Sequence, residues 1–391
     1  MPDVMPFRAW RYAPQTDLLA VTTPPYDVLS DAEVAMYKAR DAHNISHVDL
    51  PSQTPEGYRE AGETLRDWMA DGSLVRDEAP TLTLYRLSFD DATGASRTML
   101  GVLAAVPVVN YGDGGVLPHE NVTAKASTDR LDLTRATGAN LSPVWGLALA
   151  PGFARTLEAI WAGAPGRPSN LSEQGVTHEV LPIADEPSIA AVRALASTAD
   201  VLIADGHHRY GVAQRYRAEV GPGPADYTLM FVSELVADQL NIEAIHRLYD
   251  GVPFAVLRDA LAQSFDLAPA GVLSRGILDQ MVESAQLVLV APDGSAEWMT
   301  PRPGQFEGLR PLDGLWLEHA LEGVDGLSVT YQHGLDEVQG VVGQHSGAVL
   351  IRPTTIEEIR RTATEGLLMP PKSTFFTPKL RTGLVVRSLD Q

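Results

Sequence analysis

The residues with the clearest chemical potential lie in VLIADGHHRYGVAQRYR, residues 201–217. An apolar run ends in Asp205-Gly206, and the pattern that follows predicts a helix with two histidines and an arginine in its first turn. The first amides of a helix have no intrahelical acceptor and favour an anion. Glycine permits a close backbone approach, and arginine can donate two hydrogen bonds to one phosphate. We therefore predict an anion site here; the alternative is an Asp-capped helix with two partly buried histidines.

A second segment, GGVLPHENVTAKASTDRLDLTRATGAN at residues 114–140, places an imidazole, a carboxylate and several cations after glycines. A loop of this kind can carry an acid–base pair and a cationic clamp into a site. The alternative is a solvated surface loop. The residues concerned are His119, Glu120, Thr123, Lys125, Asp129 and Arg130.

A third segment, MPPKSTFFTPKL at residues 369–380, has Lys372, Ser373, Thr374 and Lys379. Met-Pro-Pro stands where a Walker A loop needs glycines, which excludes a P-loop NTPase, although Lys372 can still reach a phosphate. The chain has 30 basic residues, and only four of them are lysines, three of which fall in the second and third segments. Because lysine and arginine are not interchangeable at a tight phosphate site, this placement favours a role for these lysines.

Composition excludes several classes of protein. Fifty acidic residues against 30 basic ones give a net charge of −20, which disfavours nucleic acid and anionic membrane surfaces as partners. The chain has no cysteine, so disulfides, cysteine-type zinc sites and thiol nucleophiles are excluded. No apolar run approaches the length of a membrane span, and the first residues do not resemble a signal peptide. We expect a cytoplasmic protein.

The length of 391 residues and the order of elements predict a mixed α/β chain of the α+β class. Periodicity predicts a helix over 55–72, strands over 82–89 and 99–106 that form a hairpin, and a strand over 200–204. The Gly-, Pro- and Ser-rich residues 163–175 are predicted to form a loop or a weak boundary. We expect a nucleotide-binding catalytic domain over 1–250 and an α/β region over 251–391.

We expect the C-terminal region to contribute the MPPKST segment to the same site as residues 201–217, since Lys372 is useful only near the other motifs. Near the N-terminus, the TTPPYDVL run at 22–29 puts Asp27 in a turn set by Pro24-Pro25. Turn chemistry alone explains this run, and the sequence assigns no role to Asp27 or Lys379.

Short motifs follow one another in a recognisable order: FRAWRY and PPYDV, then PHEN, DRL and GAN, then ADGHHRY, IHRLYD and MPPKSTFFTPKL. With these motifs the chain resembles domain-of-unknown-function family 1015, from about Phe7 to Val386. Most members of that family are uncharacterised, so this resemblance implies little about activity.

The Asp-Gly-His-His-Arg core at 205–209 is also similar to the phosphate-binding segment of the ParB/sulfiredoxin-like fold. That fold includes the free serine kinases, which phosphorylate the hydroxyl of L-serine. The resemblance implies a ParB/sulfiredoxin-like core that binds ATP or ADP at the helix start, with Asp205 or Glu120 accepting the hydroxyl proton. The chain lacks the basic DNA-binding region of ParB, and the absence of cysteine excludes sulfinic acid repair.

Three functions follow as hypotheses. The first is a small-molecule kinase that transfers phosphate, with Mg²⁺, to a hydroxyl of a free amino acid such as L-serine or a similar metabolite. The second is a non-enzymatic nucleotide-binding switch or assembly factor, and the third is a metal-dependent phosphohydrolase using His119, Glu120, Asp205 and His207. The predicted site residues are Asp205, Glu120 and His208 as catalytic groups; Gly206, His207, Arg209, His119, Thr123, Lys125, Arg130, Lys372, Ser373 and Thr374 as nucleotide-binding groups; and Glu120 and Asp205 as Mg²⁺ ligands.

Overall fold

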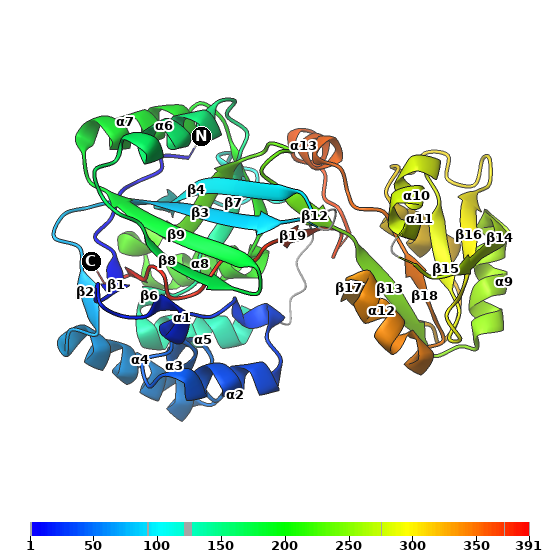
Figure 1. The fold of residues 1–391 in the computed structure, drawn as a ribbon, viewed down its shortest axis with the longest axis horizontal. Coiled ribbons are helices and arrows are strands. Elements are labelled where there is room, and N and C mark those ends of the chain that lie inside the picture. The colour runs from blue at the N-terminus through cyan, green and yellow to red at the C-terminus, as the bar shows by residue number, and fades with distance from the viewer. Residues whose placement is uncertain (1, 92–93, 121–126, 275, 371, 391) are drawn as a thin grey trace. The chain divides into compact units, whose positions relative to one another are not determined.

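The computed structural model describes residues 2–91, 94–120, 127–274, 276–370 and 372–390. Contacts divide the chain into two compact units. Unit 1 comprises residues 1–241, 363–367 and 378–391, and unit 2 comprises residues 242–362 and 368–377. Both combine helices with sheets, which confirms the mixed α+β class (Figure 1).

Unit 1 contains, within the described residues, an eight-stranded mixed sheet. Strands β3 (Leu82–Asp90) and β4 (Ser96–Pro107) of this sheet form the predicted hairpin, and they pair antiparallel. Parallel pairs join β10 to β5 and β11 to β7. In order across the sheet the strands are β5 (Val116–Leu117), β10 (Val201–Asp205), β7 (Val144–Ala148), β11 (Tyr227–Glu234), β4 (Ser96–Pro107), β3 (Leu82–Asp90), β9 (Val176–Ile183) and β8 (Ser169–Glu173).

The helices of unit 1, drawn in Figure 1, bury apolar side chains in two clusters. Phe153, Leu157 and Val192 pack against strands of this sheet, whereas Leu65, Trp68 and Leu133 belong to a second cluster that contains no strand of it. The predicted helix over 55–72 is α4, where the Thr54 side chain accepts from the Gly57 amide and Leu65 and Trp68 are buried. The helices are α1 (Leu18–Val21), α2 (Asp31–Arg40), α3 (Ser46–Asp49), α4 (Pro55–Ala70), α5 (Ser127–Thr137), α6 (Phe153–Gly163), α7 (Glu186–Ala196) and α8 (His207–Val220), with the 3-10 turns η1 (Tyr26–Val28) and η3 (Pro224–Asp226).

The prediction of a loop or boundary over 163–175 was wrong for its second half. That half forms β8, which pairs with β9 across a turn in which Gln174 and Gly175 both have positive φ. Apolar and polar residues do not alternate clearly in its SNLSE sequence, so the sequence did not indicate a strand. A strand at the edge of a sheet can keep such polar side chains in water, because it has only one neighbouring strand. The boundary between the units lies instead at residues 241–242.

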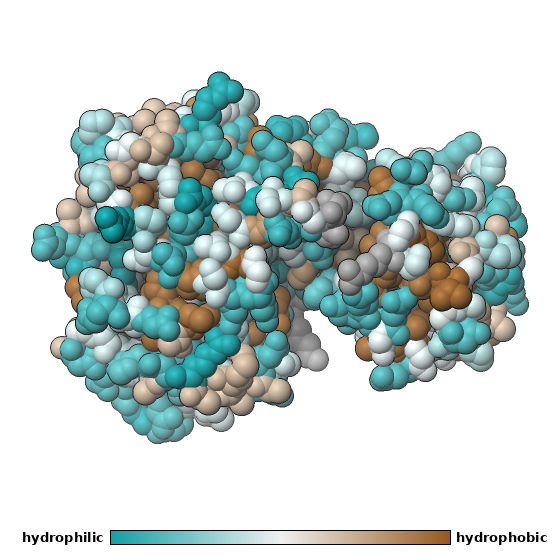
Figure 2. All heavy atoms as spheres, in the orientation of Figure 1, coloured by the Kyte–Doolittle hydropathy of each residue, from teal (hydrophilic) through white to brown (hydrophobic). Residues whose placement is uncertain are grey.

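Two short sheets complete unit 1. One joins β1 (Trp10–Tyr12) to β2 (Leu74–Arg76), and the other joins β6 (Ala139–Asn140) to β20 (Arg387–Ser388). The second of these ties the C-terminal residues to the middle of the chain. Hydrophilic residues cover most of the molecular face seen in Figure 2, as the strongly acidic composition requires.

Unit 2 is built around an antiparallel sheet whose two faces both carry helices. Successive residues of β15 point to opposite faces: Leu287 and Leu289 pack with α9 and α11, whereas Val288 and Val290 pack with α10 and α12. The strands are, across the sheet, β14 (Phe265–Val272), β16 (Ser295–Pro301), β15 (Leu287–Val290), β18 (Gly347–Leu350), β13 (Ile245–Asp250) and β17 (Ser328–His333).

The helices of unit 2 supply apolar side chains that cover its sheet. Among the residues that the structure describes, no helix in either unit is long and apolar enough to span a membrane. The helices are α9 (Phe254–Ser264), α10 (Gly276–Ser284), α11 (Asp313–Ala320), α12 (Leu335–Val341), the turn η4 (Val342–Gln344) and α13 (Ile356–Thr364), and β12 (Asn241–Glu243) pairs with β19 (Phe375–Thr377).

Candidate functional site

The junction between β10 and α8 forms as the sequence predicts. Val201 to Ile203 are fully buried, and the register with β7 shifts between Ile203 and Asp205, as in a β-bulge. Gly206 then has φ 88°, a left-handed conformation that costs other residues about 1–2 kcal/mol. Its carbonyl accepts the first helical hydrogen bond, from the Tyr210 amide at 2.9 Å. The three preceding amides of α8 therefore have no acceptor within the helix.

Asp205 lies between two cations. Its Oδ2 is 2.9 Å from Arg209 Nη2, and its Oδ1 is 3.4 Å from Lys379 Nζ. Burial alone would raise the pKa of Asp205, but the charges of Lys379 and Arg209 outweigh it and hold that pKa well below its ordinary value. The carboxylate is therefore ionised throughout the neutral range, and it positions both cations beside the first turn of α8.

Arg209 connects this ion cluster with two further segments. Its Nη1 donates to Ser142 Oγ at 3.2 Å and to the carbonyl of Pro143, and its Nη2 is 3.8 Å from Asp27 Oδ2. Burial opposes its charge, but the carboxylates of Asp205 and Asp27 raise the pKa of Arg209. The turn predicted at Asp27 thus also brings a carboxylate to the site.

Two imidazoles meet behind the turn. The His119 ring, which is fully buried, donates from Nδ1 to the carbonyl of Ile203 at 2.5 Å. Its centroid is 4.8 Å from that of His207, with the ring planes at 63°. Burial lowers the pKa of His119 to about 4. Burial also lowers the pKa of His207 well below its ordinary value, and the nearby His119 ring makes a second, smaller contribution in the same direction. Both rings are neutral at pH 7, and buried His207 Nε2 has no hydrogen-bond partner among the described residues.

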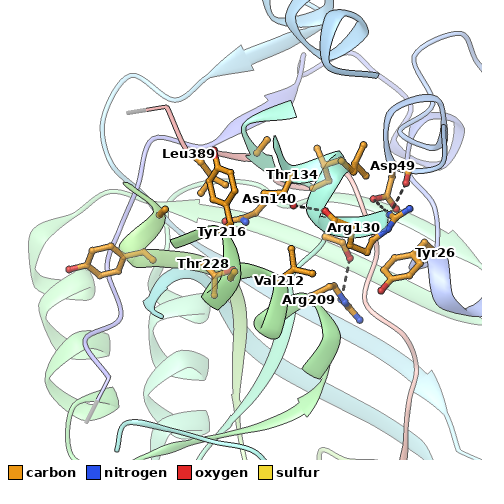
Figure 3. A pocket seen from close by; sticks show the side chains of 17 residues that line it. Tyr26, Asp49, Arg130, Thr134, Asn140, Arg209, Val212, Tyr216, Thr228 and Leu389 are labelled. Atoms are coloured by element: carbon orange, nitrogen blue, oxygen red, sulfur yellow. Dashed lines mark hydrogen bonds and ion pairs between the residues drawn. The ribbon is translucent and has the colours of Figure 1, made fainter. Parts of the chain in front are cut away.

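A pocket of about 60 Å³ opens on the other side of Arg209 (Figure 3). Tyr26, Asp49 and Arg130 form one wall of it, and Arg209 and Val212 of α8 form another. The wall also includes polar side chains from Asn140, Ser142, Tyr216 and Thr228. Arg209 therefore belongs both to the ion cluster and to the lining of this pocket.

Comparison with protein families places residues 4–317 in one of them, described as protein of unknown function (DUF1015). The chain belongs to this family. The matched residues include the PHEN, ADGHHRY and IHRLYD motifs of this DUF1015 protein, and they end before its MPPKSTFFTPKL segment. Comparison with curated proteins identifies no relative.

Solved structures similar to this DUF1015 protein share little sequence with it. A conserved hypothetical protein from Pyrococcus furiosus is 12% identical with a TM-score of 0.37, covering 69% of this chain and 92% of its own. A free serine kinase in complex with AMP is 13% identical with a TM-score of 0.38, covering 71% and 95%. A C-terminally truncated SbnI from Staphylococcus aureus is 14% identical with a TM-score of 0.41, covering 74% and 89%.

The other predicted site residues of this DUF1015 protein lie in several places. His208 is half-buried in the first turn of α8, and Glu120 is half-buried at the end of the described part of its loop. Thr123 and Lys125 lie outside the described residues. Arg130, in α5, belongs to the pocket wall.

The MPPKST segment lies in unit 2. Lys372 has an exposed side chain and a φ of 61°, and its carbonyl accepts from Arg247 Nη1 at 3.2 Å. Ser373 Oγ donates to the carbonyl of Pro370 at 2.7 Å, and Thr374 follows. A shared site with residues 201–217 stays a prediction for these three residues.

Magnesium does not fit at Asp205, because each of its oxygens already faces a cation. Within the described residues no group of three histidine, aspartate or glutamate side chains could hold a metal ion. A role for Glu120 in binding Mg²⁺ stays a prediction.

Sequence reasoning noted Lys379 and Asp27 but assigned neither of them a role, and it did not consider Asp49. For Lys379 a signal was available, since it is one of only four lysines in the chain. Asp27 had a weaker signal in the PPYDV motif that the family resemblance uses. Nothing around Asp49 distinguishes it from any other aspartate at a helix end.

Proposed function

We propose that unit 1 is a small-molecule kinase that binds the phosphates of ATP or ADP at the β10–α8 junction. It would transfer the terminal phosphoryl group to the hydroxyl of a free amino acid, such as L-serine, or of a similar metabolite. The observation that carries the proposal is the position of Lys379, which meets Arg209 at Asp205 beside the first turn of α8.

The electrostatics of the junction support phosphate binding. Phosphoryl transfer depends on positioning and charge neutralisation, and a helix start whose first amides have no acceptor within the helix, beside two cations, can supply both. Lys379 and Arg209 each carry a positive charge beside this helix start, so together they can attract a phosphate group. Neutral His207 can donate one further hydrogen bond.

The low pKa of Asp205 argues for a positioning role rather than for a general base, since a base works best with a pKa near the operating pH. In the transfer, the hydroxyl oxygen forms a bond to the terminal phosphorus while the bond to the departing nucleotide oxygen breaks. Glu120 is the remaining predicted carboxylate that could take the hydroxyl proton. His208, in the first turn of α8, would then donate a hydrogen bond to a phosphate oxygen.

Calorimetry of the full chain with ATP and ADP tests the nucleotide site. Replacing Lys379 by Gln removes one cation, and a charge-assisted hydrogen bond contributes about 1.5–3 kcal/mol, so Lys379→Gln should weaken binding about ten- to a hundred-fold. The matched control is Lys38→Gln, because Lys38 Nζ donates to the carbonyl of Leu50 in a different part of unit 1.

Turnover separates the three hypotheses. The chain is incubated with ATP or ADP and a panel of hydroxylated amino acids and metabolites, and phosphate esters are detected by mass spectrometry. An ester that disappears in His208→Ala supports the kinase. Binding without product indicates the non-enzymatic switch, free phosphate without an acceptor indicates the phosphohydrolase, and no nucleotide binding at all would refute the proposal.

A further inference from the structure

The pocket beside Arg209 contains a buried carboxylate with one oxygen unsatisfied. Asp49 is 3% exposed and lines the pocket. Its Oδ1 accepts from Arg130 Nη1 at 3.2 Å, but its Oδ2 is buried and has no hydrogen-bond partner among the described residues. Burying a charged oxygen without a hydrogen-bond partner destabilises the folded chain by about 1–3 kcal/mol or more. A ligand that donates a hydrogen bond to this oxygen would remove that penalty on binding.

The arginine beside Asp49 is held in place by contacts with three residues. Arg130 Nε donates to Asp129 Oδ2 at 2.8 Å, Nη1 also donates to the carbonyl of Asp49 at 2.8 Å, and the guanidinium lies 4.2 Å above the Tyr26 ring. Arg130 is itself buried, so it holds the Asp49 carboxylate in one orientation. Figure 3 shows the two side chains together at one wall of the pocket.

The local charge balance favours a cation. The charged groups that act on Asp49 are the guanidinium groups of Arg130 and Arg209 and the carboxylates of Asp27 and Asp129. With Asp49 itself, three carboxylates stand against two guanidinium groups. Burial is the largest influence on Asp49 and raises its pKa, although the charges of Arg130 and Arg209 act in the opposite direction; a bound monocation would also lower that pKa.

The chemistry of the pocket selects the kind of cation. A divalent ion prefers several oxygen ligands, whereas Arg130 already occupies one oxygen of Asp49. A primary ammonium group needs two or three acceptors, and the hydroxyl groups of Tyr26 and Ser142 lie in the same lining as Asp49. Apolar side chains in the lining, among them Leu141 and Val212, can pack against a short carbon stem.

We propose that Asp49 binds the primary ammonium group of a small amine in this pocket, with Arg130 as the residue that positions its carboxylate. This inference rests on the proposed function in one respect: the bound amine is the acceptor of the phosphoryl group. Arg209 lies at both sites, so an amine in the pocket is a neighbour of the ion cluster at Asp205.

Calorimetry of the full chain without nucleotide tests this site. The probes are ethanolamine and L-serine, each compared with a molecule that keeps the hydroxyl but lacks the amino group, ethylene glycol and 3-hydroxypropionate. We expect the two amines to bind at least about ten times more tightly than their partners at pH 8. Asp49→Asn keeps the shape but loses the charge and should weaken amine binding about ten- to a hundred-fold.

Asp67→Asn is the matched control, because Asp67 is exposed on α4, and it should bind amines as the wild type does. If Asp49→Asn fails to fold, the comparison of each amine with its hydroxyl partner on the wild type still decides. Equal binding of ethanolamine and ethylene glycol, or undiminished binding by Asp49→Asn, would overturn the inference. ADP binding by the wild type is measured separately, so loss of the nucleotide site is distinguished from loss of the amine site.

Discussion

At the scale of single residues, the candidate site depends on side chains that hold one another in place. Arg209 and Lys379 share Asp205, and Arg209 also contacts Ser142. The guanidinium of Arg209 thus links the proposed phosphate site to the pocket that Asp49 lines. A change at Arg209 is therefore expected to affect both sites.

His119 should make stability depend on pH. Its folded pKa of about 4 lies below the value of about 6.5 for an unfolded histidine. Between these values the unfolded chain binds a proton that the folded chain does not, so stability should fall by up to about 3 kcal/mol as pH drops from 6.5 to 4. Above pH 6.5 His119 has no effect.

Urea unfolding of the full chain at several pH values measures this dependence. His119→Asn can keep the donor to the Ile203 carbonyl but cannot titrate, so its stability should depend less steeply on pH than that of the wild type, by about one proton. The same slope in both proteins would contradict the neutral, buried state of this ring.

At the scale of elements, the turn between β10 and α8 depends on a glycine. Gly206 has φ 88°, and a Cβ built there would lie 3.1 Å from the Arg209 guanidinium and 3.3 Å from Val144 Cα. The strand therefore enters the helix by a turn in which a side chain would fit only if its neighbours shifted slightly. This brings Arg209 back over the turn and beside Asp205.

Gly206, which precedes α8, and Gly211, within α8, should respond oppositely to replacement by alanine. Gly206→Ala should destabilise the chain by at least about 1 kcal/mol, because alanine disfavours this backbone conformation. Gly211→Ala, in the helix interior with open space around its Cα, should stabilise it by about 0.5–1 kcal/mol. Thermal unfolding midpoints measure both, and a Gly206→Ala protein as stable as the wild type would refute the tight turn.

At the scale of the whole molecule, the last residues of the chain complete unit 1. Arg381 is 3% exposed and contacts Glu173 and the carbonyl of Thr22. The Thr382 amide donates to the Thr23 carbonyl at 2.8 Å, and the Val386 amide donates to the Trp10 carbonyl at 2.9 Å. These contacts also position Lys379, two residues before Arg381.

A chain that ends at residue 377 should therefore lose much of the stability of unit 1. Removing Arg381 alone takes one of two arginine partners from Glu173, which keeps Arg40 and Tyr37, so the cost of this contact should be below the roughly 3–5 kcal/mol of a fully broken buried pair. Circular dichroism during heating should show a lower midpoint, and a synthetic peptide of residues 378–391 should raise it again with concentration. A truncated chain with the wild-type midpoint would contradict this role.

Much of the fold could be predicted from local patterns. The helix α4, the β3–β4 hairpin and the turn at Gly206 follow from periodicity, capping and glycine, which act over a few residues. The edge strand β8 could not, because its polar sequence is explained only by its pairing with β9. The position of the unit boundary also depends on contacts that no local pattern contains.

The amino-acid order by itself determined that an anion-favouring helix start follows an apolar strand at Asp205-Gly206, since backbone freedom and helix amides are local properties. Only the tertiary structure decided that Lys379 and Asp27 join Arg209 there, and that Asp49 faces a pocket with an unsatisfied oxygen. Contacts between segments far apart in the chain depend on how the whole unit packs, and side-chain spacing along the sequence does not contain that information.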